Sequence, residues 1–271
     1  MDSSLKTDGD LALLIADQCV YFSSLERKPH EPSSAILQLI QGIYEIYPDQ
    51  ARRMLRNRIY ATGEITALCH GAIKVSAKRF HEGLAPLLES GAAKDLKWIP
   101  ISKLKKSDPG PLPHPLTLWK KASPPSSNSD FLWLAKELST LVPRTGPLYQ
   151  QARAVGALLT SAQGEILHWG VNTNSSNRTL HAELNLIQDY FEQTGRSIPE
   201  GAKLYVTLKP CKMCAGALWI AAKNPFTLQV YFSEFDSGRN AKWTILDVNS
   251  AERKNAAHNA TELLTQLQYQ V

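Results

Sequence analysis

In the second half of the chain, segments with apolar residues at helical spacing alternate with short segments that have the apolar pattern of strands. In His181–Thr194, apolar residues recur every third or fourth position, as on one face of an amphipathic helix. Lys203–Leu208 is a short apolar run with the length of a buried strand. The same patterns predict helices over Phe131–Val142, Pro210–Lys223 and 250–269, and strands over Ala154–Ser161, Glu165–Val171 and Leu228–Ser233. This alternation predicts an α/β domain over residues 130–271.

The first half of the chain has apolar residues mainly at helical spacing, which predicts a mainly helical N-terminal domain over residues 1–107. The segments with this spacing are Asp10–Phe22, Ser33–Tyr47 and Ala77–Ser90; Asp49–Arg58 is more polar, and a strand is expected at Lys97–Ile101. Residues 108–129 are rich in proline and serine, which predicts a linker because proline lacks a backbone donor.

Composition is that of an ordinary globular protein, with 43% hydrophobic residues and a mean hydropathy of −0.25. The first residues lack the basic and apolar regions of a signal peptide, and no apolar run has the length of a membrane span. Only four cysteines are present, too few for a disulfide framework in a chain of 271 residues. We therefore expect a cytoplasmic protein that does not bind membranes.

The net charge of +5 is concentrated in the N-terminal half. Its densest cluster is Arg52, Arg53, Arg56 and Arg58, and such clusters neutralise phosphates in nucleic acids. The alternative for each cluster is an ordinary solvated helix face. The charge thus makes RNA or single-stranded DNA a candidate partner.

The strongest chemical signal combines His181-Ala182-Glu183 with Pro210-Cys211-Lys212-Met213-Cys214. One imidazole and two thiolates supply three ligands for a tetrahedral Zn²⁺ and leave its fourth position open for water, as in catalytic zinc sites. Glu183 is then the natural proton carrier. Cys211 and Cys214 alone would also fit a redox pair, but that reading leaves the His-x-Glu motif unexplained. We expect one zinc per chain, bound by His181, Cys211 and Cys214.

These motifs resemble the zinc-dependent cytidine and deoxycytidylate deaminase superfamily. Residues 207–218, Thr-Leu-Lys-Pro-Cys-Lys-Met-Cys-Ala-Gly-Ala-Leu, are most similar to the bacterial tRNA adenosine deaminases, although Lys209 replaces their acidic residue. The resemblance covers about residues 130–271. It implies a three-layer αβα sandwich with a mixed sheet, and hydrolytic deamination of cytosine or adenine with Glu183 as catalytic residue. It also implies substrate binding by Asn172 and by the backbone N–H of Ala182.

Two features leave the substrate open. The motif and the basic clusters favour a polynucleotide such as tRNA. By contrast, only Glu234–Lys242 precedes Trp243–Val248, too short for a parallel crossover, so a fifth strand there would return antiparallel, as in deaminases of free nucleosides. A free nucleoside, nucleotide or related heterocycle is therefore the alternative substrate. A nucleic-acid or protein binder with a vestigial zinc site is the non-enzymatic alternative, which the intact Glu183 disfavours.

The N-terminal half contains no second His-x-Glu or Pro-Cys-x-x-Cys motif, which excludes a second active domain of this type. A degenerate, inactive copy is compatible with the sequence. The oligomeric state also stays open, with a homodimer as one alternative.

Overall fold

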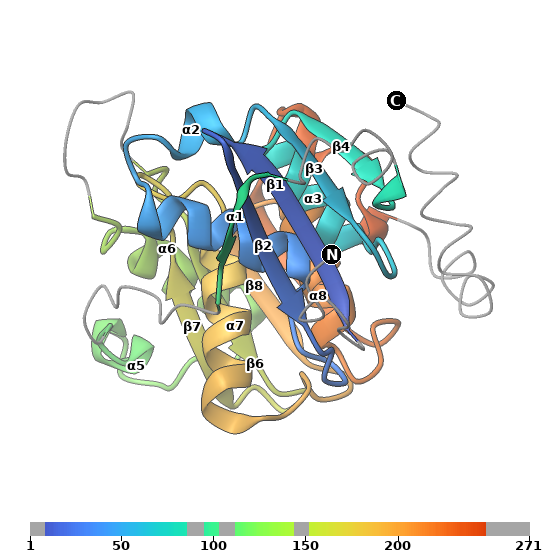
Figure 1. The fold of residues 1–271 in the computed structure, drawn as a ribbon. Helices are drawn as coiled ribbons and strands as arrows, with labels where there is room; N and C mark the ends of the chain where they lie inside the picture. Colours follow the sequence, from blue (N-terminus) through green and yellow to red (C-terminus); the bar gives the residue numbers. More distant parts are fainter. Residues whose placement is uncertain (1–8, 86–94, 103–111, 144–151, 248–271) are drawn as a thin grey trace.

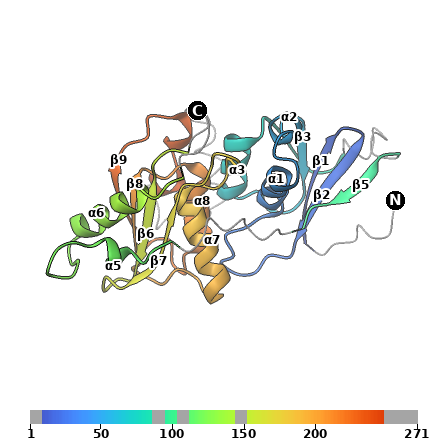
Figure 2. The same ribbon diagram turned by 90° about the vertical axis from the view of Figure 1, so that its left-hand side faces the viewer.

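A computed structural model of the chain describes residues 9–85, 95–102, 112–143 and 152–247 (Figure 1). Within these ranges, two mixed β-sheets are separated by a double layer of helices, as Figure 2 shows from the side. One sheet belongs to each half of the chain. None of the helices in these ranges is long and apolar enough to cross a membrane.

The C-terminal sheet has the strand order β7-β6-β8-β9. Its strands are β6 (Gly156–Thr160), β7 (Ile166–Val171), β8 (Lys203–Leu208) and β9 (Gln229–Glu234). Strand β6 pairs antiparallel with both β7 and β8, and β9 lies parallel to β8. Helices α7 (Ala182–Thr194) and α8 (Lys212–Ala221) cover one face, and α6 (Asn128–Ser139) covers the other (Figure 2). The predicted αβα sandwich with a mixed sheet is confirmed.

Local chemistry explains where these helices begin and end. Helix α6 starts with a capping box, in which Ser127 and Asp130 each accept a hydrogen bond from the other's backbone N–H. Helix α7 ends at Gly195, whose φ of 63° is a left-handed conformation that glycine adopts easily. Helix α6 therefore begins inside the predicted linker, which also contains the short helix α5 (Pro115–Leu118).

The N-terminal half is not mainly helical, and that prediction is wrong. Within the described residues it holds a sheet with the strand order β4-β3-β1-β2-β5. The strands are β1 (Asp10–Ala16), β2 (Cys19–Leu25), β3 (Arg58–Ala61), β4 (Arg79–Glu82) and β5 (Lys97–Pro100). The helices are α1 (Ala35–Ile46), α2 (Ala51–Met54) and α3 (Ala67–Ser76).

The error at Asp10–Phe22 has a clear physical cause. Strand β1 is buried on both faces, so its apolar residues form a continuous run, and periodicity alone cannot distinguish such a run from a helix. The turn between β1 and β2 is made by Asp17 and Gln18 at φ values of 49° and 59°, which matches the two-residue turns of hairpins. These are not the usual Asn-Gly or Asp-Gly residues, so no turn could be recognised there from the sequence.

Of the other predictions for the N-terminal half, two are confirmed and one is wrong. Helix α1 confirms the helix at Ser33–Tyr47, and β5 confirms the strand at Lys97–Ile101. The helix expected at Ala77–Ser90 is wrong where the structure describes it, because Arg79–Glu82 pairs with β3 as an edge strand. Residues 86–90 lie outside the described ranges.

At the C-terminal end, the expected fifth strand at Trp243–Val248 is wrong over the described residues. Trp243 has a φ of 54°, and Ile245–Asp247 forms a 3-10 helix, neither of which fits a strand. Ion pairing between Lys209 Nζ and Asp247 Oδ1, 2.6 Å apart, attaches this helix beside the metal motif. The helix predicted over 250–269 lies outside the described residues.

The two halves share one hydrophobic core. Helices α1 and α3 pack against α7 and α8 in the middle of the molecule (Figure 2), and buried side chains form one continuous cluster across this boundary. Its members include Ile40, Leu68 and Ala72 from the first half and Leu184, Met213 and Leu218 from the second. The two helical layers therefore hold each other in place.

Candidate active site

The sheet topology brings the two sequence motifs together. Strands β7 and β8 both run antiparallel to β6, so their carboxyl ends lie at the same edge of the sheet. Helix α7 follows β7 and helix α8 follows β8, so the N-termini of both helices meet at this edge. His181 and Cys211 are the N-cap residues of the two helices, and neither side chain caps its own helix. Their side chains are therefore free to face one another.

His181, Cys211 and Cys214 form a compact set of potential metal ligands. His181 Nδ1 lies 3.5 Å from Cys211 Sγ and 3.6 Å from Cys214 Sγ, and the two sulfur atoms are 3.7 Å apart. In a tetrahedral zinc site with ordinary bond lengths, sulfur–sulfur separations are about 3.8 Å and sulfur–nitrogen separations about 3.6 Å. The three side chains therefore fit zinc. Within the described ranges, this is the one group of its kind.

The charges in this cluster are mutually dependent. The hydrogen bond from Cys214 and the nearby His181 hold the pKa of the Cys211 thiol well below its usual value, against the effect of burial. Burial by itself lowers the pKa of His181, but the charge and hydrogen bond of Cys211 raise it to about 9. Cys211 at the start of α8 also benefits from the positive end of the helix dipole. Its position thus favours a thiolate, the form that binds metal.

Glu183 lies in the first turn of α7 with only 4% of its surface exposed. Burial raises the pKa of its carboxyl group to about 7, although the charge of His181 opposes this shift. A carboxyl group with a pKa near neutrality can both take and return a proton, as a general acid–base catalyst must. Glu183 lines the same cavity as His181 and Cys211.

The cavity has a volume of about 290 Å³ and is formed by segments from both halves of the chain. Asp236 lines it, and its Oδ2 accepts a hydrogen bond from Arg153 Nη1 at 3.4 Å. Arg153 and Val75 also line the cavity, and sequence reasoning missed both. Arg153 precedes β6 without any motif, and Val75 is an unremarkable apolar residue at the end of α3.

The two predicted substrate-binding groups contact each other. The Ala182 N–H donates to Asn172 Oδ1 at 3.0 Å, and Asn172 Nδ2 donates to the Arg153 carbonyl at 3.1 Å. Asn172 lines the cavity and fixes the N-terminus of α7. A contact between the Ala182 N–H and a base would require this bond to break.

Three nearby apolar residues, Trp169, Leu180 and Phe235, lie outside this cavity. Trp169 packs against His114, with ring centroids 4.8 Å apart, in the core beneath α6. Leu180 is buried, and Phe235 is 80% exposed. Trp169 is therefore a packing residue.

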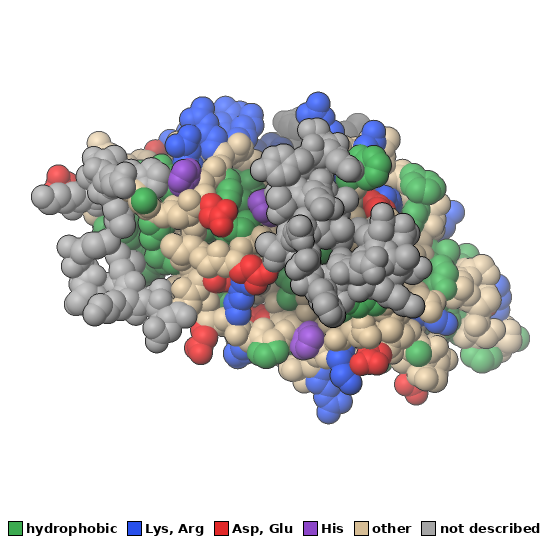
Figure 3. All heavy atoms as spheres, turned by 90° about the vertical axis from the view of Figure 1, so that its right-hand side faces the viewer, with side chains coloured by type: hydrophobic (Ala, Val, Ile, Leu, Met, Phe, Trp, Pro, Cys, Tyr) green, Lys and Arg blue, Asp and Glu red, His purple; other side chains and the backbone are tan. Residues whose placement is uncertain are grey.

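The predicted arginine cluster lies outside the cavity. Arg53 binds Asp17 through both guanidinium nitrogens, at 2.6 and 2.7 Å, so its charge is already paired. Arg52, Arg56 and Arg58 are exposed. On the face shown in Figure 3, Lys and Arg side chains gather most densely at the upper edge, with a smaller group at the lower edge. These arginines as nucleic-acid ligands stay a prediction.

The αβα sandwich, the His-Cys-Cys set and the adjacent buried glutamate define a domain of the cytidine deaminase type. Comparison with known families agrees: residues 147–257 match the Bd3614-like deaminase family. Over these residues the chain is similar to the cytidine deaminase-like superfamily.

The chain is 34% identical over 103 residues to a tRNA-specific adenosine deaminase of Bacillus subtilis (strain 168), covering 37% of this chain and 61% of that protein. It is 41% identical over 68 residues to a tRNA-specific adenosine deaminase of Agrobacterium fabrum (strain C58 / ATCC 33970), covering 25% and 45%. The chain thus spans less than two thirds of each of these relatives. A solved guanine deaminase structure from Bacillus subtilis matches 43% of this chain and 73% of its own, with 25% identity and a TM-score of 0.33.

Proposed function

We propose that this protein is a zinc-dependent hydrolytic deaminase of nucleobases. The observation that carries the proposal is the spacing of His181 Nδ1, Cys211 Sγ and Cys214 Sγ, which matches a tetrahedral zinc site beside the buried carboxyl group of Glu183. A redox pair would need only the two cysteines, whereas here the imidazole is as close to each sulfur as the sulfurs are to each other.

Zinc held by His181, Cys211 and Cys214 would supply a Lewis acid that lowers the pKa of water towards 7. The remaining chemistry belongs to the protein. Glu183 takes a proton from the attacking water and delivers it to the ring nitrogen, while the water oxygen bonds to the amino-bearing carbon, C6 of adenine or C4 of cytosine. Glu183 then takes the proton of the newly bound hydroxyl group and passes it to the amine, the C–N bond breaks, and ammonia leaves behind a carbonyl group. Asn172 positions α7, which carries both His181 and Glu183.

We propose adenine in a polynucleotide, in particular tRNA, as the substrate. Both relatives described above are named as tRNA-specific adenosine deaminases, and one matches at 41% identity. The antiparallel fifth strand, which was the argument for a free nucleoside, is absent from the described residues. A free nucleoside or related heterocycle thus becomes an outcome of the test, as does a binder with a vestigial site.

The test is incubation of the purified full-length chain with a bacterial tRNA pool, single-stranded DNA, free adenosine and free cytidine. Nucleoside mass spectrometry then detects inosine or uridine. We expect inosine in tRNA, and loss of this product after treatment with a zinc chelator and its return when zinc is restored. Product from free nucleosides alone would contradict the substrate, and no product from any of these would contradict the deaminase.

A further inference from the structure

The two sheets are built in the same way. In each half a hairpin (β1 and β2, or β6 and β7) is followed by a long helix, a third strand antiparallel to the first, another helix, and a fourth strand parallel to the third. The N-terminal half adds the short helix α2 before its third strand and the strand β5 beside β2. The register agrees to the residue. Ala12 faces Ala61 and Leu14 faces Ile59, while the residues 145 positions later, Ala157 with Val206 and Leu159 with Leu204, face each other in the same way.

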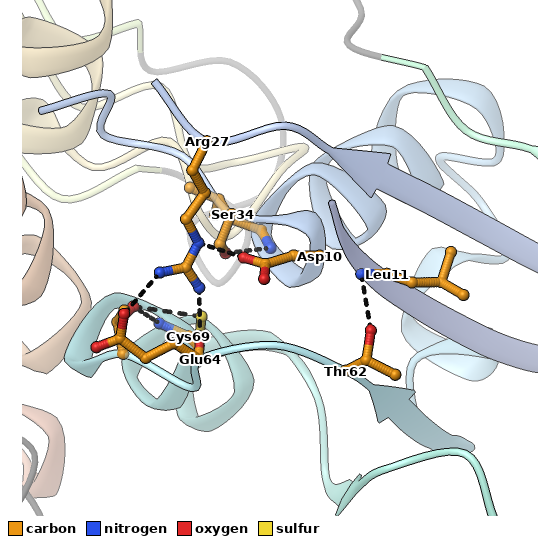
Figure 4. Close-up of polar contacts among 9 residues, drawn as sticks. Asp10, Leu11, Arg27, Ser34, Thr62, Glu64 and Cys69 are labelled. Carbon is orange, nitrogen blue, oxygen red and sulfur yellow. Dashed lines mark hydrogen bonds and ion pairs between the residues drawn. The ribbon is translucent and has the colours of Figure 1, made fainter. Parts of the chain in front are cut away.

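Residue identities and hydrogen bonds follow the same shift of 145 positions. In the segment from β3 through α3, identical residues recur in β8 and α8: Tyr60 and Tyr205, Thr62 and Thr207, Cys69 and Cys214, Gly71 and Gly216, Ala72 and Ala217, Ala77 and Ala222. The Leu11 N–H donates to Thr62 Oγ1 at 3.2 Å, and the Gly156 N–H donates to Thr207 Oγ1 at 3.3 Å. Figure 4 shows the first of these bonds. Such agreement at side-chain level indicates a duplicated domain.

The two copies meet around a pseudo-twofold axis. A Cβ atom on Gly71 of α3 would lie 2.3 Å from Met213 Cα, and one on Gly216 of α8 would lie 2.3 Å from the Leu68 nitrogen. Gly71 and Gly216 are equivalent under the shift of 145 positions, and so are Leu68 and Met213. The contact of Gly71 with Met213 is therefore the symmetric equivalent of the contact of Gly216 with Leu68. Such reciprocal contacts are the mark of an isologous interface. Gln41 Nε2 also donates to Gln188 Oε1 at 3.3 Å, and each glutamine lies seven positions after its helix N-cap, Ser34 or His181.

The N-terminal copy has lost the catalytic residues. When the N-caps of α1 and α7 are aligned, a shift of 147 positions, Ser34 occupies the position of His181 and Ile36 that of Glu183. With the shift of 145 positions, Thr66 occupies the position of Cys211, and Cys69 alone retains its counterpart's identity. Figure 4 shows this region, in which Thr66 Oγ1 donates to Cys69 Sγ at 3.3 Å and Arg27 pairs with Asp10 and Glu64. A serine, a threonine and one cysteine do not make a zinc site.

Each copy nevertheless contributes to the other's cavity. Val75, near the C-terminal end of α3, lines the cavity that holds His181 and Cys211. Its counterpart 145 positions later, Ile220 of α8, lines a cavity of about 390 Å³ beside Thr66 in the N-terminal copy. The backbone oxygen of Ile220 lies 3.2 Å from His30 Nδ1. Each half thus contributes an equivalent wall residue to the cavity of the other half. Only the cavity of the C-terminal half contains the candidate catalytic residues.

We propose that the N-terminal half is an inactive duplicate of the deaminase domain that serves as its permanent partner, and that Val75 forms a wall of the catalytic cavity which restricts what can enter. The face of α8 that α3 covers is therefore closed to a second copy of the chain. The effect of Val75 on catalysis rests on the proposed deaminase function. The position of Val75 in the cavity wall does not depend on that function.

The test compares Val75→Phe with Ile220→Phe, the same enlargement at symmetric positions. The full-length chain is stripped of metal with a chelator and treated with iodoacetamide, and peptide mass spectrometry measures the alkylation rate of Cys211. We expect Val75→Phe to slow this rate at least about fivefold and Ile220→Phe to leave it unchanged, with melting temperatures of both variants near that of the parent chain. Equal rates in both variants, or no slowing in Val75→Phe, would overturn the proposal.

Zinc-loaded protein provides the second measurement. On an adenosine-containing RNA stem-loop, Val75→Phe should raise KM about tenfold or more at unchanged zinc content, while Ile220→Phe should match the parent chain. An unchanged KM in Val75→Phe would overturn the proposal. The alkylation rates can respond as expected while neither the parent chain nor any variant deaminates a substrate. That result would contradict the proposed function but would still support Val75 as a wall of the cavity.

Discussion

The two halves place different side chains at the same helix N-termini. In the N-terminal half, Ser34 and Thr66 accept hydrogen bonds from the backbone N–H groups of Leu37 and Cys69, as ordinary caps do. In the C-terminal half, His181 and Cys211 make no such bonds and instead face each other. The comparison teaches that one scaffold supports either helix capping or a cluster of potential metal ligands at these positions, and that the half with the cluster lacks the two side-chain caps.

The largest expected effect concerns the glutamate that only one half possesses. Glu183→Gln should lower the deamination rate by a factor of about 10²–10⁴ or more, because the amide cannot carry a proton. Zinc content should stay at the parental level, since Glu183 is not among the ligands. The matched control is Glu64→Gln, beside the N-terminal cavity, which should retain parental activity. An equal loss of activity in both variants would contradict the claim that only the C-terminal half has a glutamate required for deamination.

The next effect tests the symmetric contact. Gly71→Ala and Gly216→Ala each force a methyl group to within 2.3 Å of backbone atoms of the facing helix, which cannot move aside as a side chain can. Overpacking of this kind costs about 1–3 kcal/mol. Both variants should lower the free energy of unfolding by similar amounts in urea denaturation. A loss in one variant alone would argue against a symmetric interface.

A smaller effect separates capping from binding. Ser34→Ala should lower the free energy of unfolding by about 0.5–2 kcal/mol, because the Leu37 N–H loses its partner. Activity should not change, because Ser34 lies in the half without chemistry. Ser33→Ala, one position earlier, is the control and should have a smaller effect on urea denaturation. If Ser34→Ala removed activity while leaving stability intact, the serine would be functional rather than a cap.

The smallest effect concerns the arginines. If Arg52 and Arg56 contact phosphates, binding to single-stranded RNA should weaken with salt, with a log–log slope of about −0.7 per phosphate neutralised. Replacing either residue by glutamine should flatten that slope by about this amount. Arg53→Gln should change it less, because Asp17 already pairs with Arg53. Identical slopes in all three variants would leave this cluster as a solvated surface.

The sequence predicted the half with chemistry far better than its partner. Strand β8 and helix α7 have the expected bounds within a residue, because clear periodicity coincides with caps and motifs there. Strand β1 was missed because a strand buried on both faces lacks alternation. A degenerate copy stayed an open alternative in the sequence, because the retained residues, such as Thr62 and Gly71, serve packing and not chemistry. Val75 could not be found from sequence, since its role depends on how α3 meets the second half.

The most direct test of the central claim is the zinc content of the full-length chain by native mass spectrometry, with Cys214→Ser and Cys69→Ser as matched variants. These cysteines occupy equivalent positions in the two copies. We expect one zinc in the parent chain, one in Cys69→Ser and none in Cys214→Ser, because three ligands converge in one half only. Two zinc ions in the parent chain, or loss of zinc in Cys69→Ser with retention in Cys214→Ser, would contradict the account.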